Sequence, residues 1–204
     1  MKLHYFNIYG RAESVRFLLA HAKVEYENVY ETGDTMKDLK PKLEFGQLPM
    51  LEVDGKNLVQ SWSILRFLGR QHGYYPQDLE TAFTIDSTID AVEDYLAAYF
   101  KFNFESNEEK KAIFKENWLK MFPVWLAAIE KRLEGKRFIT GDKLTIADFA
   151  LAAVGFNLLL NEANPHYAET MVLIKDHEVL KKYAANLKEE LGEYLAARPQ
   201  PRPF

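Results

Sequence analysis

Two short apolar runs flank an Asp-Gly pair in the stretch MLEVDGKNLV, residues 50–59. Asp-Gly favours the tight turn of a β-hairpin, because both central residues of a type I′ turn adopt positive φ. The stretch therefore predicts two antiparallel strands joined by Asp54 and Gly55, so the first third of the chain has to contribute strands to a sheet.

Strand and helix patterns alternate before and after this hairpin. Short β-branched and aromatic runs predict strands, and apolar residues at helical spacing predict helices. The additional strands are expected at residues 3–8 and 26–30, and the helices at residues 13–22, 34–43 and 61–73. The predicted order is βαβαββα, and we expect this first domain to span residues 1–75.

The remainder of the chain, residues 76–204, shows long helical patterns and few strand signals. Apolar stripes predict helices from about 79 to 104 and from 108 to 133. The second domain is therefore expected to be all-helical, which makes the fold class α+β.

One helix of the second domain carries a clear start signal in GDKLTIADF, residues 141–149. Thr145 followed three residues later by Asp148 predicts a capping box, in which the acid reaches back to the cap residue. Residues 146–160 are almost wholly apolar. We expect this helix to be central and buried.

Composition excludes several classes of function. The 204 residues include no cysteine, so disulfides, Cys-ligated metals and a protein thiol nucleophile are excluded. The formal net charge is −4 without a basic stripe, which argues against a nucleic-acid binder. The five histidines show no metal-ligand spacing, and we expect no metal. Any sulfur chemistry must come from a ligand.

No targeting or membrane-spanning segment is evident. The N-terminal stretch MKLHYFNIYGRAE lacks the apolar region of a signal peptide. No stretch approaches the ~20 apolar residues needed to span a bilayer. We expect a cytoplasmic protein that binds no membrane.

Gln47-Leu48-Pro49 precedes the hairpin and is the first candidate for chemistry. A cis bond before Pro49 would expose the N–H and C=O of Leu48 as an edge that pairs with an extended peptide. Cis bonds are uncommon even before proline, so the local sequence alone favours an ordinary trans loop.

Two further candidates carry hydrogen-bonding groups. Gln60 and Ser61 begin a predicted helix, where free N–H groups and a hydroxyl suit a carboxylate, although Ser61 as a simple N-cap is the commoner role. Tyr5 lies near the end of the first predicted strand, with Arg11 shortly after it, and offers a phenolic donor. A core-packed aromatic is the more frequent outcome for such a tyrosine.

Taken in order, four stretches resemble the cytosolic glutathione transferases, most closely the sigma class and the related nematode-type enzymes. They are LHYFNIYGRAESVRFLL, LKPKLEFGQLPMLEVDG, QSWSILRFLGRQHG and GDKLTIADF. The resemblance covers nearly the full length. It implies a thioredoxin-like N-terminal domain, an all-helical C-terminal domain, a two-fold homodimer and glutathione as co-substrate.

The resemblance also assigns roles toward the thiol and the charged ends of glutathione. Tyr5 falls on the catalytic tyrosine and Arg11 on the arginine that supports the thiolate site. Lys40 matches the lysine that meets the glycyl carboxylate. Asp94 matches the acid that reaches across the dimer to the γ-glutamyl amine.

The remaining matched positions line the binding site for the peptide backbone and the γ-glutamyl end of glutathione. Gln47 and Leu48 fall on the residues that line the cysteinyl backbone, and Pro49 falls on the cis-proline. Gln60 and Ser61 fall on the pair that holds the γ-glutamyl carboxylate. Together the matched groups provide a partner for each charged group of glutathione.

Two positions depart from the pattern. Met36 stands where the sigma class has a tryptophan at the glycyl end, so one contact to glutathione is absent. Lys101 stands where prostaglandin-forming members carry a tryptophan, so their substrate does not carry over.

We expect an apolar pocket for the second substrate, a small electrophile. Its predicted walls are Tyr9, Lys101, Ala150, Val154 and Phe204. Ala150 and Val154 lie one helical turn apart, and ordinary core packing explains them equally well.

Three functions remain open at this point. The first is a glutathione transferase that conjugates small electrophiles. The second is a glutathione-dependent isomerase or peroxidase on the same scaffold. The third is a non-enzymatic carrier or structural relative, which the retained Tyr5, Arg11, Gln60 and Ser61 disfavour.

Overall fold

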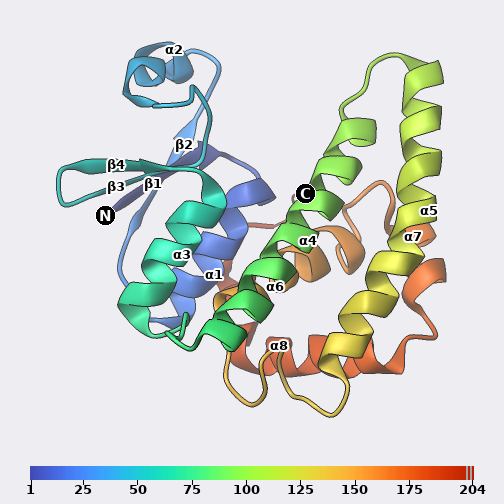
Figure 1. The fold of residues 1–204 in the computed structure, drawn as a ribbon. Helices are drawn as coiled ribbons and strands as arrows, with labels where there is room; N and C mark the ends of the chain where they lie inside the picture. The colour runs from blue at the N-terminus through green and yellow to red at the C-terminus, as the bar shows by residue number, and fades with distance from the viewer. Residues whose placement is uncertain (201, 203) are drawn as a thin grey trace.

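The computed structural model describes residues 1–200, Arg202 and Phe204 (Figure 1). Its N-terminal part contains a four-stranded sheet and three α-helices. These elements are β1 (Lys2–Phe6), α1 (Glu13–His21), β2 (Glu27–Glu31), α2 (Thr35–Leu39), β3 (Met50–Val53), β4 (Lys56–Val59) and α3 (Ser61–His72). Short 3₁₀ turns lie at Gly10–Ala12 and Lys40–Lys42. The predicted βαβαββα order is confirmed.

The sheet has the strand order β2-β1-β3-β4. β1 and β2 are parallel, whereas β3 is antiparallel to both β1 and β4. Asp54 and Gly55 both have positive φ, 49° and 72°, as the hairpin prediction requires. In Figure 1, α1 and α3 lie on one face of the sheet and α2 lies on the other.

The C-terminal part is helical, as predicted. Its elements are α4 (Leu79–Asn103), α5 (Glu108–Leu133), α6 (Ile146–Val154), a π-turn (Gly155–Leu159), α7 (Tyr167–Ile174) and α8 (Glu178–Ala197). All nine residues of α6 are buried, which confirms the prediction of a central helix. The single helix expected over 146–160 is wrong in one respect, because regular α-helix ends at Val154 and continues as the π-turn.

The two parts are joined by packed helices and a buried polar network. α1 packs against both α6 and α8. The carboxylate of Glu13, on α1, accepts hydrogen bonds from Arg16 (2.9 Å), Arg198 (2.9 Å) and Tyr194 (3.0 Å). α3 and α4 are connected through residues 73–78, and a domain boundary after residue 75 stays a prediction.

Within the described residues, no helix is both long and apolar enough to cross a membrane. Likewise, no group of three or more His, Cys, Asp or Glu side chains in the described part of the chain is placed to hold a metal ion.

Candidate active site

Tyr5 lies near the end of β1 and is 7% exposed. Its hydroxyl oxygen accepts a hydrogen bond from the backbone N–H of Arg11, at 3.0 Å. Burial raises the pKa of the phenol, more than the Arg11 N–H and the positive charges of Arg11 and Arg16 lower it. The hydroxyl therefore keeps its proton near neutral pH, and with its oxygen already used as an acceptor it is oriented to donate.

Because Gly10 has no side chain, it leaves room for the Tyr5 hydroxyl. A Cβ at residue 10 would lie 2.5 Å from the Tyr5 oxygen, well inside contact distance. The φ of Gly10 is +46°, which L-residues rarely adopt. The turn between β1 and α1 therefore places Tyr5 and Arg11 together only because residue 10 has no side chain.

We expect Gly10→Ala to lower turnover severalfold, because the added methyl displaces the Tyr5 hydroxyl. Gly33 lies in a distant turn, and a Cβ there would meet no atom within 4 Å, so Gly33→Ala is the matched control. Steady-state kinetics of both variants would test this. Wild-type turnover in Gly10→Ala would contradict the tight placement of Tyr5.

Arg11 forms a bidentate ion pair with Glu93 on α4. Its Nη2 lies 2.8 Å from Oε1, and its Nη1 contacts Oε2. The indole Nε1 of Trp62 donates to the same carboxylate at 2.7 Å. The guanidinium is thus fixed by α4, and Arg11 meets the Tyr5 hydroxyl through its backbone N–H.

Sequence reasoning missed Glu93. It directly precedes Asp94 in VEDYL, and the resemblance drew attention to Asp94 alone. Glu93 is half-buried and lines the groove, whereas Asp94 is exposed and does not line it. The ion pair with Arg11 spans 82 residues, so no local pattern in the sequence points to it.

One groove brings together most of the residues predicted to hold glutathione. It is lined by Arg11, Gln47, Leu48, Pro49, Gln60 and Ser61, together with Phe6, Met36, Gly46, Trp62 and Glu93. The groove runs along the edge where β3 begins and α3 starts. Residues from the first domain and from α4 therefore form one binding surface.

The peptide bond between Leu48 and Pro49 is cis. The resemblance predicted this bond, whereas the local sequence alone favoured trans. Leu48 precedes β3, so its backbone stands at the groove edge.

Ser61 is the first residue of α3, and Gln60 is the N-cap residue, with a φ of 71°. The alternative reading of Ser61 as a simple N-cap is therefore wrong. Its side chain is 5% exposed and makes no hydrogen bond to any described residue. The hydroxyl and the first N–H groups of the helix are left available to a ligand.

Met36 lies at the α2 end of the groove, and Lys40 lies beside Gly46 without lining the groove itself. Lys40 is exposed in the 3₁₀ turn after α2, and its Cε is 3.9 Å from the Cβ position of Gly46. Met36 lines the groove and packs on the cluster of Leu39, Leu43 and Met50. A thioether has no N–H to donate.

The five residues predicted for the electrophile pocket are not brought together. Phe204 lines a small cleft beside Gly10 and Arg11, with Phe100 of α4 on its wall. This cleft adjoins the groove through Arg11 and Trp62, which line both.

The other four predicted pocket residues lie elsewhere. Tyr9 is 2% exposed and donates its hydroxyl to the carbonyl of Pro199 at 2.9 Å. Ala150 is fully buried, and Val154 lines a different cavity inside the helical part. Lys101 is exposed with its Nζ 4.2 Å from the ring centre of Phe114.

The sheet topology, the cis-proline edge and the tyrosine beside a helix-flanked groove define a thioredoxin-like enzyme with an added helical domain. Two family models match the chain: the glutathione S-transferase N-terminal domain over residues 1–70 and the C-terminal domain over residues 93–198. The chain therefore belongs to the glutathione S-transferase family, whose members use glutathione as co-substrate, and the resemblance drawn from its motifs is confirmed.

Individual relatives agree with this assignment. The chain is 34% identical to glutathione S-transferase 3 of Caenorhabditis elegans, covering 98% of each chain. It is 31% identical to hematopoietic prostaglandin D synthase of Gallus gallus, covering 90% of this chain and 93% of the relative. A solved structure described as a monomeric glutathione S-transferase of Necator americanus superposes with a TM-score of 0.82, 26% identity and 98% coverage of both chains.

Proposed function

We propose that this transferase joins the thiol of glutathione to small apolar electrophiles, in the cytoplasm, with Tyr5 holding the sulfur as thiolate. The observation that carries the proposal is the Tyr5 hydroxyl, whose oxygen accepts the N–H of Arg11 and whose proton remains to be donated. Thiolate is the reactive form of a thiol, so a single donor at the sulfur acts directly on the rate.

The groove offers a partner for each polar part of glutathione. Ser61 and the start of α3 suit the γ-glutamyl carboxylate, with Gln60 beside them. Leu48, held by cis-Pro49 and flanked by Gln47, suits the cysteinyl amide.

Lys40 at the far end suits the glycyl carboxylate. Its ammonium is exposed, so this contact is weaker than a buried one.

We assign the binding of the γ-glutamyl ammonium to Asp94 of a second copy of the chain. Glu93 lies in the groove, but its carboxylate is already occupied by Arg11 and Trp62. Asp94 is exposed on α4, and Phe67 and Phe83 on α3 and α4 are 45% and 72% exposed. A homodimer that covers this face would bring Asp94 to the partner's groove.

The small apolar electrophile is assigned to the cleft that contains Phe100 and Phe204. Both are aromatic, and Phe204 packs edge-on against Phe104 with ring centres 5.4 Å apart. Tyr9, Lys101, Ala150 and Val154 do not line this cleft.

We expect the protein to conjugate glutathione to an activated aryl chloride, and Ser61→Ala to weaken glutathione binding by roughly tenfold or more. A hydrogen bond to a charged group contributes roughly 1.5–3 kcal/mol, which corresponds to such a factor. Ser63→Ala is the control, because Ser63 lies on the same helix and is exposed. Calorimetry with glutathione measures the affinity, and equal affinities for the two variants would contradict the assigned carboxylate site.

A glutathione-dependent isomerase is the second candidate, because one relative is named as a prostaglandin D synthase. An isomerase regenerates free glutathione in every turnover, whereas conjugation consumes it. Counting thiols before and after the reaction therefore separates the two functions.

A further inference from the structure

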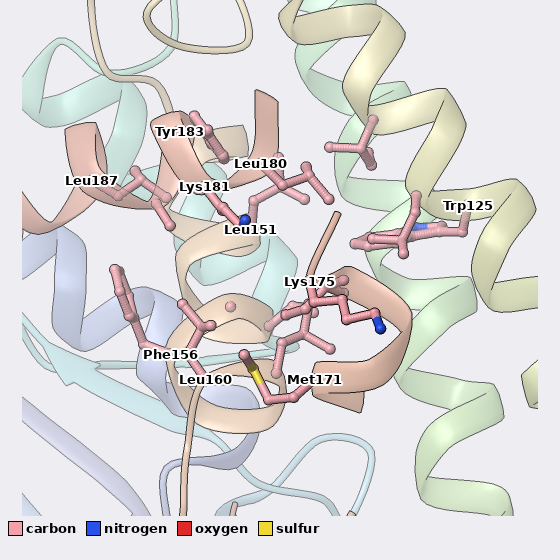
Figure 2. A pocket seen from close by; sticks show the side chains of 17 residues that line it. Trp125, Leu151, Phe156, Leu160, Met171, Lys175, Leu180, Lys181, Tyr183 and Leu187 are labelled. Atoms are coloured by element: carbon pink, nitrogen blue, oxygen red, sulfur yellow. The ribbon is translucent and has the colours of Figure 1, made fainter. Parts of the chain in front are cut away.

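The helical part of the molecule contains a cavity of about 120 Å³, open to solvent on one side, between α5, α6, the π-turn, α7 and α8. Figure 2 shows its side chains, with Trp125 on one side and Leu187 on the other. The cavity shares no lining residue with the glutathione groove. Protein interiors contain few voids larger than a water molecule, and an apolar cavity of about 150 Å³ can stay dry and bind a benzene ring.

The wall of this cavity is apolar except at its solvent side. Lys175 and Lys181 are the only charged residues among those that line it, and both are exposed. Lys181 is paired with Glu178 at 2.7 Å. Lys175 makes no ion pair with any described residue, so its ammonium is the charge available to a ligand.

The π-turn forms part of the cavity wall through Gly155, Phe156 and Leu159. Single π-turns within helices occur frequently at functional sites. Gly155 begins this turn with an ordinary helical φ of −58°, so the backbone does not require glycine there. A Cβ at residue 155 would meet no atom within 4 Å, which means that the missing side chain leaves free space at the cavity wall.

We propose that the cavity binds a monocarboxylate with an apolar tail, of the medium-chain fatty acid class. The end of the tail lies between Trp125 and Leu187, and the carboxylate meets Lys175 at the mouth. An apolar interior suits the alkyl chain, and one unpaired ammonium suits a single negative charge. The site is separate from Tyr5 and goes beyond the conjugation reaction.

The test is titration of the whole protein with octanoate by calorimetry, first alone and then with an S-alkyl glutathione conjugate present in excess. The conjugate fills the groove and the electrophile cleft, so the remaining heat reports a separate site. We expect one octanoate per chain. Gly155→Leu should weaken binding at least tenfold, whereas Gly192→Leu, also a helical glycine with open space but outside the cavity, should not.

Charge is tested by Lys175→Glu, with Lys182→Glu as the control for net charge. Lys182 is exposed on α8 and does not line the cavity. Lys175→Glu should weaken octanoate binding about fivefold to tenfold, leave octan-1-ol unchanged and favour octylamine. Because Lys175 is exposed, this variant also serves if Gly155→Leu does not fold.

Three results would overturn the proposal. The first is no octanoate binding at millimolar concentration. The second is binding that the glutathione conjugate abolishes, which would place the ligand at the groove instead. The third is equal binding of octanoate, octan-1-ol and octylamine by the wild type, which would remove the role of Lys175.

Discussion

Replacing Tyr5 by phenylalanine is expected to lower the rate of conjugation about 10- to 25-fold at pH 7, with little change in the affinity for glutathione. The substitution removes one oxygen and its proton and keeps the ring that packs beside Phe6, with centres 5.7 Å apart. The fold around the site should persist, so the loss reports the hydroxyl itself.

The magnitude follows from the ionisation of the thiol. A free thiol has a pKa of about 8.5, so only about 3% is thiolate at pH 7. A hydrogen bond to a charged acceptor contributes roughly 1.5–3 kcal/mol, and 1.36 kcal/mol corresponds to one pKa unit. The bound thiol should therefore titrate between about 6.5 and 7.5, with roughly 25–75% ionised.

The pH dependence provides the sharper measurement. In the wild type, the rate should rise with pH and level off above the lowered pKa of the bound thiol. In Tyr5→Phe, the inflection should move up toward the value of about 8.5 for a free thiol, so the two rates converge at high pH. Absorbance of the thiolate in the glutathione complex measures the same shift directly.

A matched control is available on the neighbouring strand. Tyr30 pairs with Tyr5 in the parallel register of β1 and β2, and it is 39% exposed. Tyr30→Phe should leave rate and thiol pKa unchanged. If Tyr5→Phe kept the wild-type thiol pKa, the role assigned to the phenol would be wrong.

Most of the fold could be predicted from local patterns. The Asp54-Gly55 turn fixes the hairpin through its positive φ angles, and alternating strand and helix patterns fix the order of the first domain. The start of α6 was also predictable, because a capping box depends on residues three apart.

The missed features depend on contacts between distant segments. Glu93 forms an ion pair with Arg11, which lies 82 residues away in the sequence, and nothing within VEDYL marks Glu93 rather than Asp94 as the functional carboxylate. Ala150 and Val154 were placed in the electrophile pocket from helical spacing, but spacing gives the face of a helix and not what covers it. α1 and α8 pack on α6, so Ala150 became core. The cap was assigned to Ser61 because hydroxyls favour that position, whereas the structure places Gln60 there.

Asp148 provides the prediction with the largest effect on stability. Its carboxylate is fully buried at the start of α6 and accepts four hydrogen bonds. Oδ1 accepts from the N–H of Ile139 (3.0 Å) and the hydroxyl of Tyr183 (2.8 Å). Oδ2 accepts from the N–H (2.8 Å) and the hydroxyl (2.9 Å) of Thr145. One side chain thus joins α6, α8 and the preceding loop.

Asp148→Ala is expected to lower the free energy of unfolding by about 3–5 kcal/mol, because it leaves buried donors without acceptors and opens a small void. That is a large part of the roughly 5–15 kcal/mol that stabilises a typical protein of this kind.

Asp148→Asn should lose less stability than Asp148→Ala. Its amide oxygen still accepts hydrogen bonds, whereas its NH₂ group faces donors and accepts none. Asp142→Ala, exposed in the same loop, is the control. Urea unfolding followed by circular dichroism measures all three. A loss below about 1 kcal/mol in Asp148→Ala would mean that the four donors find other partners, and that the start of α6 is held by packing rather than by this carboxylate.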